Sequence, residues 1–194
     1  PFMRKPAYMK IANLPLEQRV IEMNKPEENQ LARKIGEELE SSDLRLVTVE
    51  TTAGGLISAQ LLSIAGASRW FDRGIVAYSE RSKIDTFGGV GIDRELLRKY
   101  GAVSPEVVEM LASSFCEYSG ADFGIAESGL AGPKTSQRSE KSIGSVVIAV
   151  KSPSGVESES KYFEGNRIEI MSQAANCALE MLYESIVKYK YKSV

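Results

Sequence analysis

Residues 44–64 read LRLVTVETTAGGLISAQLLSI, and this stretch decides the expected fold. Its apolar beginning, Leu44 to Val49, is typical of a buried strand. Gly54 and Gly55 follow and open a second apolar run, Leu56 to Ile64, which suits a helix that begins directly at a tight turn. The stretch therefore predicts a strand that passes through a glycine turn into a helix.

Helices and strands continue to alternate on both sides of this unit. Upstream, Leu31, Ile35 and Leu39 recur at helical spacing. Downstream, the patterns predict strands at residues 74–79 and 122–127, helices at 82–86, 93–99 and 104–118, a hairpin of residues 143–150 and 156–163, and a long final helix from residue 166. This order predicts a three-layer α/β/α sandwich with a mixed, mostly parallel sheet and a C-terminal antiparallel hairpin.

Two of the predicted helices carry start signals. Ser104-Pro105 combines an N-cap hydroxyl with a proline at the first helical position. Asn166, with Glu169 three residues later, resembles a capping box in which asparagine replaces serine or threonine. Residues 129–142 hold two glycines, a proline and several charges, and they predict a long loop before the hairpin.

The chain divides into an N-terminal arm, residues 1–26, and one α/β domain, residues 27–194. The arm holds four of the seven prolines and a short amphipathic stretch, Leu14 to Met23. We expect it to pack on the domain or on a neighbouring subunit of a homo-oligomer. A domain of this length buries about 70% of the surface that its unfolded chain exposes, which is enough for one core.

The charge balance and hydropathy exclude several partners. With a net charge of −2 and a pI near 5.5, the chain has no general field that attracts a phosphate backbone, so we expect no nucleic-acid partner. The lysine–tyrosine alternation from Lys188 to Lys192 predicts a fraying helix end, with contact to an acidic partner as the alternative. No apolar run approaches the ~18 residues of a membrane span, and no signal-peptide core is present. These features predict a cytoplasmic protein without a membrane partner.

Cysteine and histidine usage limits the chemistry. Cys116 and Cys177 stand far apart in sequence, so we expect two buried thiols and neither a disulfide framework nor a zinc knuckle. The sequence contains no histidine, which removes Ser-His-Asp and Cys-His nucleophile activation and the commonest metal ligand. Lysine, tyrosine, serine, threonine and carboxylates remain available for hydrolytic chemistry.

Polar or glycine-rich segments follow three predicted strands. They are residues 50–55, residues 78–83 and residues 128–133. Unpaired N–H groups at the first turn would suit a phosphate or a carboxamide, and a desolvated Lys83 near Tyr78 would serve as a base. Each segment also has a plain interpretation as a chain reversal, or as a surface lysine beside a packing tyrosine. Together they predict a shared crevice outside the carboxyl ends of the strands.

These segments and two others resemble the CinA C-terminal family, the stand-alone nicotinamide-nucleotide amidohydrolases. The family pattern runs E-S-x-T-G-G, G-x-V-x-Y-S-N-x-x-K, G-A-V-S, T-G-I-A-G-P and G-D-R. The corresponding blocks here are ETTAGG at 50–55, GIVAYSERSK at 74–83, GAVS at 101–104, SGLAGP at 128–133 and GNR at 165–167. The resemblance covers roughly residues 27–187.

The resemblance implies a three-layer sandwich that deamidates nicotinamide mononucleotide to nicotinate mononucleotide and ammonia, with neither metal nor cofactor. The family's attacking serine falls on Thr51, and its tyrosine and lysine fall on Tyr78 and Lys83, which would activate the hydroxyl. The residues expected to hold the nucleotide substrate are Glu50, Thr52, Gly54, Gly55, Ser128, Gly129, Gly132 and Arg167.

The most serious departures from the family pattern are Thr51 for serine, Ala53 for threonine, Glu80 for asparagine, Glu127 for a small apolar residue and Met171 for arginine. The β-methyl of threonine restricts its side-chain rotamers and the approach of substrate. An unpaired carboxylate is costly to bury, so we expect the Glu127 side chain to turn away from the site or to pair with a lysine, Lys83 or Lys141.

Two other functions fit the sequence. One is a nucleotide-binding protein that has kept the crevice and lost turnover. The other is an assembly module, because the family's domain also occurs fused to a second domain, whereas this chain carries an N-terminal arm.

Overall fold

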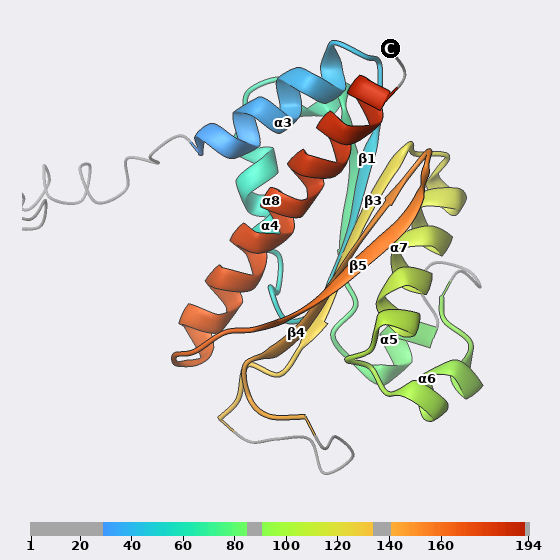
Figure 1. The fold of residues 1–194 in the computed structure, drawn as a ribbon, viewed down its shortest axis with the longest axis vertical. Coiled ribbons are helices and arrows are strands. Elements are labelled where there is room, and N and C mark those ends of the chain that lie inside the picture. Colours follow the sequence, from blue (N-terminus) through green and yellow to red (C-terminus); the bar gives the residue numbers. More distant parts are fainter. Residues whose placement is uncertain (1–28, 85–90, 134–140, 193–194) are drawn as a thin grey trace, which may run out of the picture.

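The computed structural model describes residues 29–84, 91–133 and 141–192 (Figure 1). The predicted arm, residues 1–26, lies outside the described residues, and so does the middle of the predicted loop at 129–142. Within the described part of the chain, no helix is both long enough and apolar enough to cross a membrane.

A five-stranded mixed sheet forms the middle layer. The spatial order is β2-β1-β3-β4-β5, with β1 parallel to both β2 and β3, and with β4 antiparallel to β3 and to β5. The strands are β1 (Leu46–Glu50), β2 (Phe71–Val76), β3 (Phe123–Gly129), β4 (Ser145–Ser152) and β5 (Gly155–Tyr162). The predicted mixed sheet and its C-terminal hairpin are confirmed.

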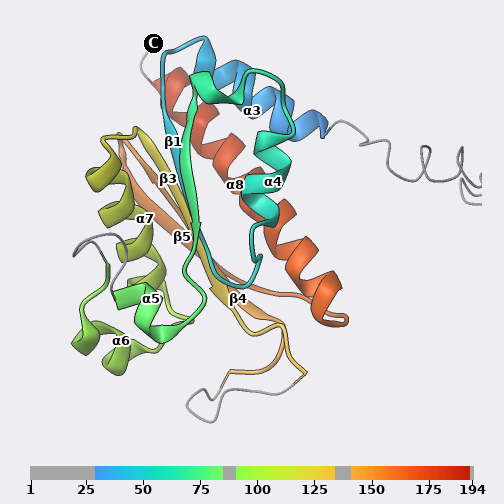
Figure 2. The same ribbon diagram turned by 180° about the vertical axis from the view of Figure 1, so that it is seen from behind.

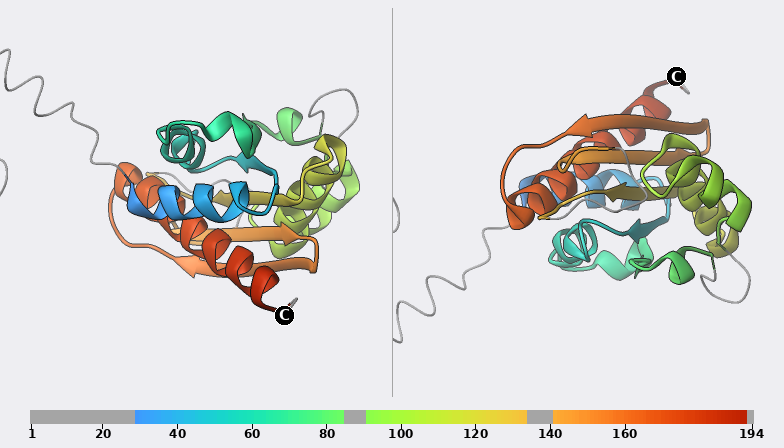
Figure 3. Two further views of the ribbon diagram at one scale, coloured as in Figure 1. Left: turned by 90° about the horizontal axis from the view of Figure 1, so that it is seen from above. Right: turned by 90° about the horizontal axis from the view of Figure 1, so that it is seen from below.

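Helices cover both faces of the sheet, as Figure 2 shows from behind and Figure 3 from above and below. One face carries α3 (Gln30–Glu40), α4 (Leu56–Leu62) and α8 (Arg167–Lys192), and the other carries α5 (Glu80–Ile84), α6 (Arg94–Tyr100) and α7 (Pro105–Ser119). A short 3₁₀ helix, η1 (Ala67–Arg69), precedes β2. The three-layer α/β/α sandwich is therefore confirmed.

The two faces follow from the period-two alternation of the central strands. Leu46 and Ile125 join the hydrophobic core under α3, α4 and α8, whereas Val47 and Ala126 join the core under α7. Both faces are buried, which is why β1 lacks the polar alternation of a half-exposed strand. At Gly124 a Cβ atom would come within 2.6 Å of the Ala112 carbonyl oxygen, so α7 lies directly against β3.

Both predicted helix starts are confirmed. The Ser104 hydroxyl accepts a hydrogen bond from the Val107 amide at 3.4 Å, and Pro105 is the first residue of α7. The Asn166 side chain accepts from the Glu169 amide at 3.2 Å, while the Glu169 carboxylate accepts from the Asn166 amide at 2.7 Å. The reciprocal pair forms the expected capping box and fixes the start of α8.

Strand β2 begins and ends three residues before its predicted range of 74–79. Pairing with β1 starts at Phe71, and after Val76 the chain turns into α5. The Ser79 hydroxyl accepts from the Ser82 amide at 3.0 Å, which commits this segment to a helix start rather than to the strand. Helix α5 accordingly begins at Glu80 rather than at the expected Ser82.

The lysines of the predicted fraying helix end have acidic partners within the chain, because Lys188 pairs with Glu157 at 2.7 Å and Lys190 pairs with Glu38. One smaller expectation is wrong. Of the two free thiols, Cys116 is buried and donates to the Ala121 carbonyl, but Cys177 is only half-buried. Helix α8 leaves the side of Cys177 open to solvent because it covers the sheet with one stripe only.

Candidate functional site

The three segments predicted to form a crevice meet at one edge of the sheet. Because β1 and β3 are parallel neighbours, their carboxyl ends lie side by side, and the Thr51 hydroxyl donates to the Glu127 carbonyl oxygen at 3.0 Å. Strand β2 joins them through a hydrogen bond from the Ala77 amide to the Glu50 carbonyl oxygen at 2.8 Å. This edge is where ligands bind in open α/β sheets.

Arg167 joins two further motif blocks to this edge. One of its guanidinium nitrogens donates to the Gly132 carbonyl oxygen and another donates to the Tyr78 hydroxyl, each at 2.8 Å. The Tyr78 side chain is 61% exposed, so this contact holds a phenol at the surface of the edge. The start of α8, the turn after β3 and the segment after β2 therefore converge at one place.

The Glu50 carboxylate accepts hydrogen bonds from the backbone N–H groups that follow the glycine turn. Its carboxylate accepts from the amides of Gly55 at 2.8 Å, Ile57 at 3.0 Å and Ser58 at 2.8 Å. Gly54 and Gly55 have φ of +65° and +104°, a left-handed conformation that glycine adopts without steric cost. The sequence predicted these N–H groups to be unpaired and available to a ligand. They are instead paired with a carboxylate of the chain itself, which complements the first turn of α4.

A buried network supports Glu50 from the side of the sheet. The Ser58 hydroxyl donates to the Glu50 carboxylate at 2.6 Å and contacts the Thr48 hydroxyl at 2.7 Å. A Cβ atom at Gly74 would lie 2.4 Å from both hydroxyl oxygens, so glycine is required in β2 to leave room for this network. The sequence interpretation missed Ser58 and Thr48. The signal that could have identified them is a polar residue within an otherwise apolar strand or helix.

Glu127 points into the turn between β1 and α4. One carboxylate oxygen accepts from the Thr51 amide at 2.6 Å and from the Ala53 amide at 2.8 Å, and the residue is fully buried. The expectation that Glu127 turns away from the site or pairs with a lysine is wrong, because the turn offers converging N–H groups that a small apolar side chain would leave unpaired. Lys141 donates instead to the Val103 carbonyl oxygen.

The second carboxylate oxygen of Glu127, Oε2, is buried without a hydrogen-bond partner in the described part of the chain. The pKa of Glu127 is raised to about 7, mainly by burial and also by the nearby charge of Glu50, while the backbone N–H groups of the turn act in the opposite direction. Glu127 is one of the departures from the family pattern, but it is not among the predicted site residues. A glutamate that ends the strand Phe-Gly-Ile-Ala was the available signal.

Lys83 is the buried cation of the site. Its ammonium nitrogen donates to the Tyr78 carbonyl oxygen at 2.9 Å, and only 5% of the residue is exposed. Burial lowers the pKa of Lys83, and the charges of Glu127 and Glu80 partly offset that effect. The predicted pair therefore meets through the backbone of Tyr78, while the Tyr78 hydroxyl contacts Arg167.

The remaining predicted residues lie in the same region. Thr51, Thr52 and Ser128 are buried, with 3%, 4% and 2% of each residue exposed. At Gly129 a Cβ atom would lie 2.8 Å from the Ser145 carbonyl oxygen, so glycine allows β4 to approach. At Gly54 a Cβ atom would lie 3.2 Å from the terminal methyl carbon of Met171, which places the Met171 side chain against the turn.

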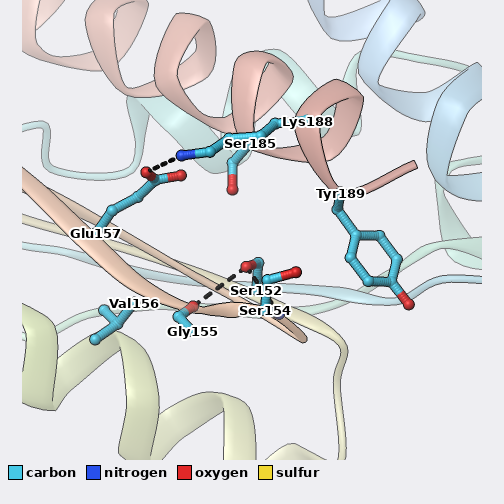
Figure 4. Close-up of a pocket in the computed structure, with 8 residues that line it drawn as sticks. All are labelled: Ser152, Ser154, Gly155, Val156, Glu157, Ser185, Lys188 and Tyr189. Atoms are coloured by element: carbon cyan, nitrogen blue, oxygen red, sulfur yellow. Dashed lines mark hydrogen bonds and ion pairs between the residues drawn. The ribbon is translucent and has the colours of Figure 1, made fainter. Parts of the chain in front are cut away.

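A separate pocket of about 130 Å³ lies at the opposite end of the sheet, between the β4–β5 hairpin and the end of α8 (Figure 4). It is lined by Ser152, Ser154, Gly155, Val156, Glu157, Ser185, Lys188 and Tyr189. None of the predicted site residues belongs to it. Among the described residues, no group of three or more histidine, cysteine, aspartate or glutamate side chains could hold a metal ion.

The arrangement of these motifs agrees with a family assignment. The family model of the CinA C-terminal domain matches residues 28–186. The chain belongs to this family. Solved relatives have the same fold: a competence or damage-inducible protein from Enterobacter asburiae has a TM-score of 0.76 and 28% identity, covering 81% of this chain and 96% of that one. The protein CihA from Agrobacterium tumefaciens has a TM-score of 0.73 and 36% identity, with 79% and 92% covered.

Curated relatives in the CinA family differ in length. The nicotinamide-nucleotide amidohydrolase PncC of Enterobacter agglomerans is 34% identical over 161 residues, which are 82% of this chain and 96% of PncC. A CinA-like protein of Syntrophobacter fumaroxidans is 37% identical over 153 residues, which are 79% of this chain but 35% of that protein. The chain thus spans about a third of the length of several curated relatives that it matches.

Proposed function

We propose that this domain hydrolyses the carboxamide of nicotinamide mononucleotide, or of a related amide, to give the carboxylate and ammonia without a metal. The observation that carries the proposal is the convergence of a hydroxyl, a buried lysine and an arginine-held phenol at the ligand edge of the sheet. The likeness to PncC, which extends over nearly the whole of that protein, supports the choice of substrate.

In this proposal Thr51 is the nucleophile. Its hydroxyl oxygen attacks the carboxamide carbon, and its proton passes to the Lys83 amine, whose lowered pKa favours the neutral form that accepts it. The tetrahedral intermediate then expels ammonia, which takes up that proton, and water hydrolyses the resulting ester of Thr51. The Thr51 hydroxyl donates to the Glu127 carbonyl oxygen in the resting structure, so it must rotate before attack.

Tyr78 and Arg167 take the outer part of the site. The phenol of Tyr78, held by Arg167, belongs with Lys83 to the group that activates the hydroxyl in this proposal. Arg167 supplies a fixed positive charge for the phosphate of the nucleotide, because a guanidinium matches phosphate geometry. The turns at Gly132 and Gly54 bring backbone close to the ligand.

One observation favours a second function, a nucleotide-binding protein without turnover. The amides of Thr51 and Ala53, which would stabilise an oxyanion on a substrate of Thr51, already donate to Glu127. A site with these donors occupied retains its shape and loses a major source of transition-state stabilisation.

Ammonia release separates the two functions. The purified domain is incubated with nicotinamide mononucleotide at micromolar enzyme, and ammonia is measured alongside calorimetric binding of the same nucleotide. The amidohydrolase proposal expects ammonia in proportion to enzyme. Nucleotide binding without ammonia would refute it and support the binding protein.

A further inference from the structure

The turn between β1 and α4 forms a concave group of backbone donors around one oxygen of Glu127. The amides of Thr51 and Ala53 donate to this oxygen at 2.6 and 2.8 Å, and the amide of Thr52 acts on the same carboxylate. Successive N–H groups that converge in this way bind anionic oxygen in proteins. The turn has the donor arrangement of an anion site.

The neighbouring strand β3 provides the side chain that occupies this site, Glu127. Glu127 is a residue of β3, and its side chain crosses to the end of β1 because the two strands are adjacent and in register up to Val49 and Ala126. Only one of its two carboxylate oxygens accepts hydrogen bonds from these amides. The other oxygen, Oε2, is buried without a hydrogen-bond partner among the described residues, and the Glu50 carboxylate on the same turn adds repulsion.

A side chain held in this way is an imperfect ligand for its own site. A carboxylate that uses one oxygen and leaves the other unsatisfied retains part of its desolvation cost. An anionic oxygen on a bound molecule whose remaining polar groups are satisfied would use the same donors without that cost. Exchange of the internal ligand for an external one is therefore favourable once Glu127 leaves.

We propose that the backbone of residues 51–53 is an anion-binding site that Glu127 occupies in cis, and that its external ligand is a singly charged oxygen, either a carboxylate or the oxyanion of a tetrahedral intermediate. Binding of a carboxylate is independent of the proposed amidohydrolase function. Use of the site for an oxyanion rests on that function. Glu127 is then a positioning residue that keeps the site closed in the resting protein.

The first test uses the Glu127→Ala variant, which removes the internal ligand, and Glu127→Gln as the matched control, which keeps a neutral oxygen of the same reach in the site. Acetate is titrated at constant ionic strength, and backbone amide resonances are followed by NMR. We expect saturable shifts of the Thr51, Thr52 and Ala53 amides in Glu127→Ala and none in the wild type or Glu127→Gln. A folded Glu127→Ala domain without such shifts, or a wild type that shifts equally, would overturn the proposal.

A second measurement uses the wild-type domain and does not depend on how a variant folds. The carboxyl carbon of Glu127 and the amide protons of Thr51 and Ala53 are titrated together, with Glu50 and the charges on α5, Lys83 and Glu80, followed as neighbours. We expect the two amides to move with the Glu127 carboxyl at one shared midpoint. If the amide chemical shifts of Thr51 and Ala53 do not change as Glu127 titrates, Glu127 does not occupy the site and the proposal is overturned.

Turnover separates this proposal from the proposed function. If the freed donors stabilise an oxyanion, Glu127→Ala should release ammonia from nicotinamide mononucleotide at least about tenfold faster than Glu127→Gln. Acetate binding without ammonia from any variant would support the anion site and refute the amidohydrolase. Ammonia from the wild type, with no acetate binding by folded Glu127→Ala, would overturn the anion site and leave the amidohydrolase standing.

Discussion

Two buried glutamates accept hydrogen bonds from the turn between β1 and α4, and they differ in how many of their carboxylate oxygens are paired. Glu50 ends β1 and receives donors on both carboxylate oxygens, from the start of α4 and from Ser58. Glu127 lies two residues before the end of the neighbouring strand β3 and receives donors on one oxygen only. Burial alone therefore does not define the role of a carboxylate. A fully bonded glutamate holds the fold of the turn, whereas a half-bonded one occupies a position that a ligand can take.

The largest effect is expected for Glu50→Ala. This change leaves three backbone N–H groups and the Ser58 hydroxyl without their acceptor, and each buried unpaired donor costs about 1–3 kcal/mol. We expect the free energy of unfolding to fall by at least about 3 kcal/mol, as measured by urea denaturation. Glu50→Gln, which keeps one acceptor oxygen, should lose less. A loss below about 1 kcal/mol for Glu50→Ala would contradict the structural role of Glu50.

The second prediction concerns Glu127→Gln and pH. The folded pKa of Glu127, about 7, lies above its ordinary value of 4.5, so the folded state binds more protons between these pH values. Stability from this group is therefore fully present below about pH 4.5 and is lost as the pH rises through 7. Because one pKa unit corresponds to about 1.36 kcal/mol, the wild type should lose up to about 3 kcal/mol across this window.

Glu127→Gln removes that dependence. We expect the variant to be more stable than the wild type at pH 8 and about equally stable at pH 5, in urea unfolding at both pH values. Glu159→Gln, a change at an exposed carboxylate on β5, is the control and should leave the pH dependence of the wild type intact. Parallel pH curves for the wild type and Glu127→Gln would show that Glu127 does not titrate as the structure implies.

The smallest effect is expected for Ser58→Ala. The Ser58 hydroxyl supplies one of the four donors to Glu50 and the contact with Thr48, while the Ser58 amide keeps its own bond. Loss of this hydrogen bond to a carboxylate should cost about 1.5–3 kcal/mol in the free energy of unfolding. Ser63→Ala, at an exposed hydroxyl after α4, should cost less than about 0.5 kcal/mol. Equal losses of unfolding free energy in Ser58→Ala and Ser63→Ala would show that the Ser58 hydroxyl does not stabilise the network.

The sequence predicted the layers, the strand order along the chain and the edge where the motifs meet, because these depend on local patterns. The strand at 44–49 and the capping box at Asn166 are of this kind. The acceptors of the backbone N–H groups in the turn between β1 and α4 could not be predicted. It depends on Glu127 reaching across from a strand 76 residues away, and on Glu50 folding back onto the helix that follows it.

The site residues divide in the same way. The glycine turn, Tyr78 and Arg167 were predicted from motif blocks, and the structure brings them to one edge. Their contacts were not predictable, since the hydrogen bond from Lys83 to the Tyr78 carbonyl depends on how the chain turns from β2 into α5. Ser58 was missed because a serine in an apolar helix carries no motif. Its importance follows from the space above Gly74.

The proposed function depends on the Thr51 hydroxyl as the nucleophile, and we would measure this by ammonia release from nicotinamide mononucleotide in Thr51 and Thr52 variants. Thr51→Ala should abolish turnover while nucleotide affinity stays within about tenfold, or ~1.4 kcal/mol, because only an interaction made in the transition state is lost. Thr51→Ser should retain or increase the rate, since it keeps the hydroxyl and removes the β-methyl. Thr52→Ala should keep most of the activity. An inactive Thr52→Ala beside an active Thr51→Ala would contradict the account.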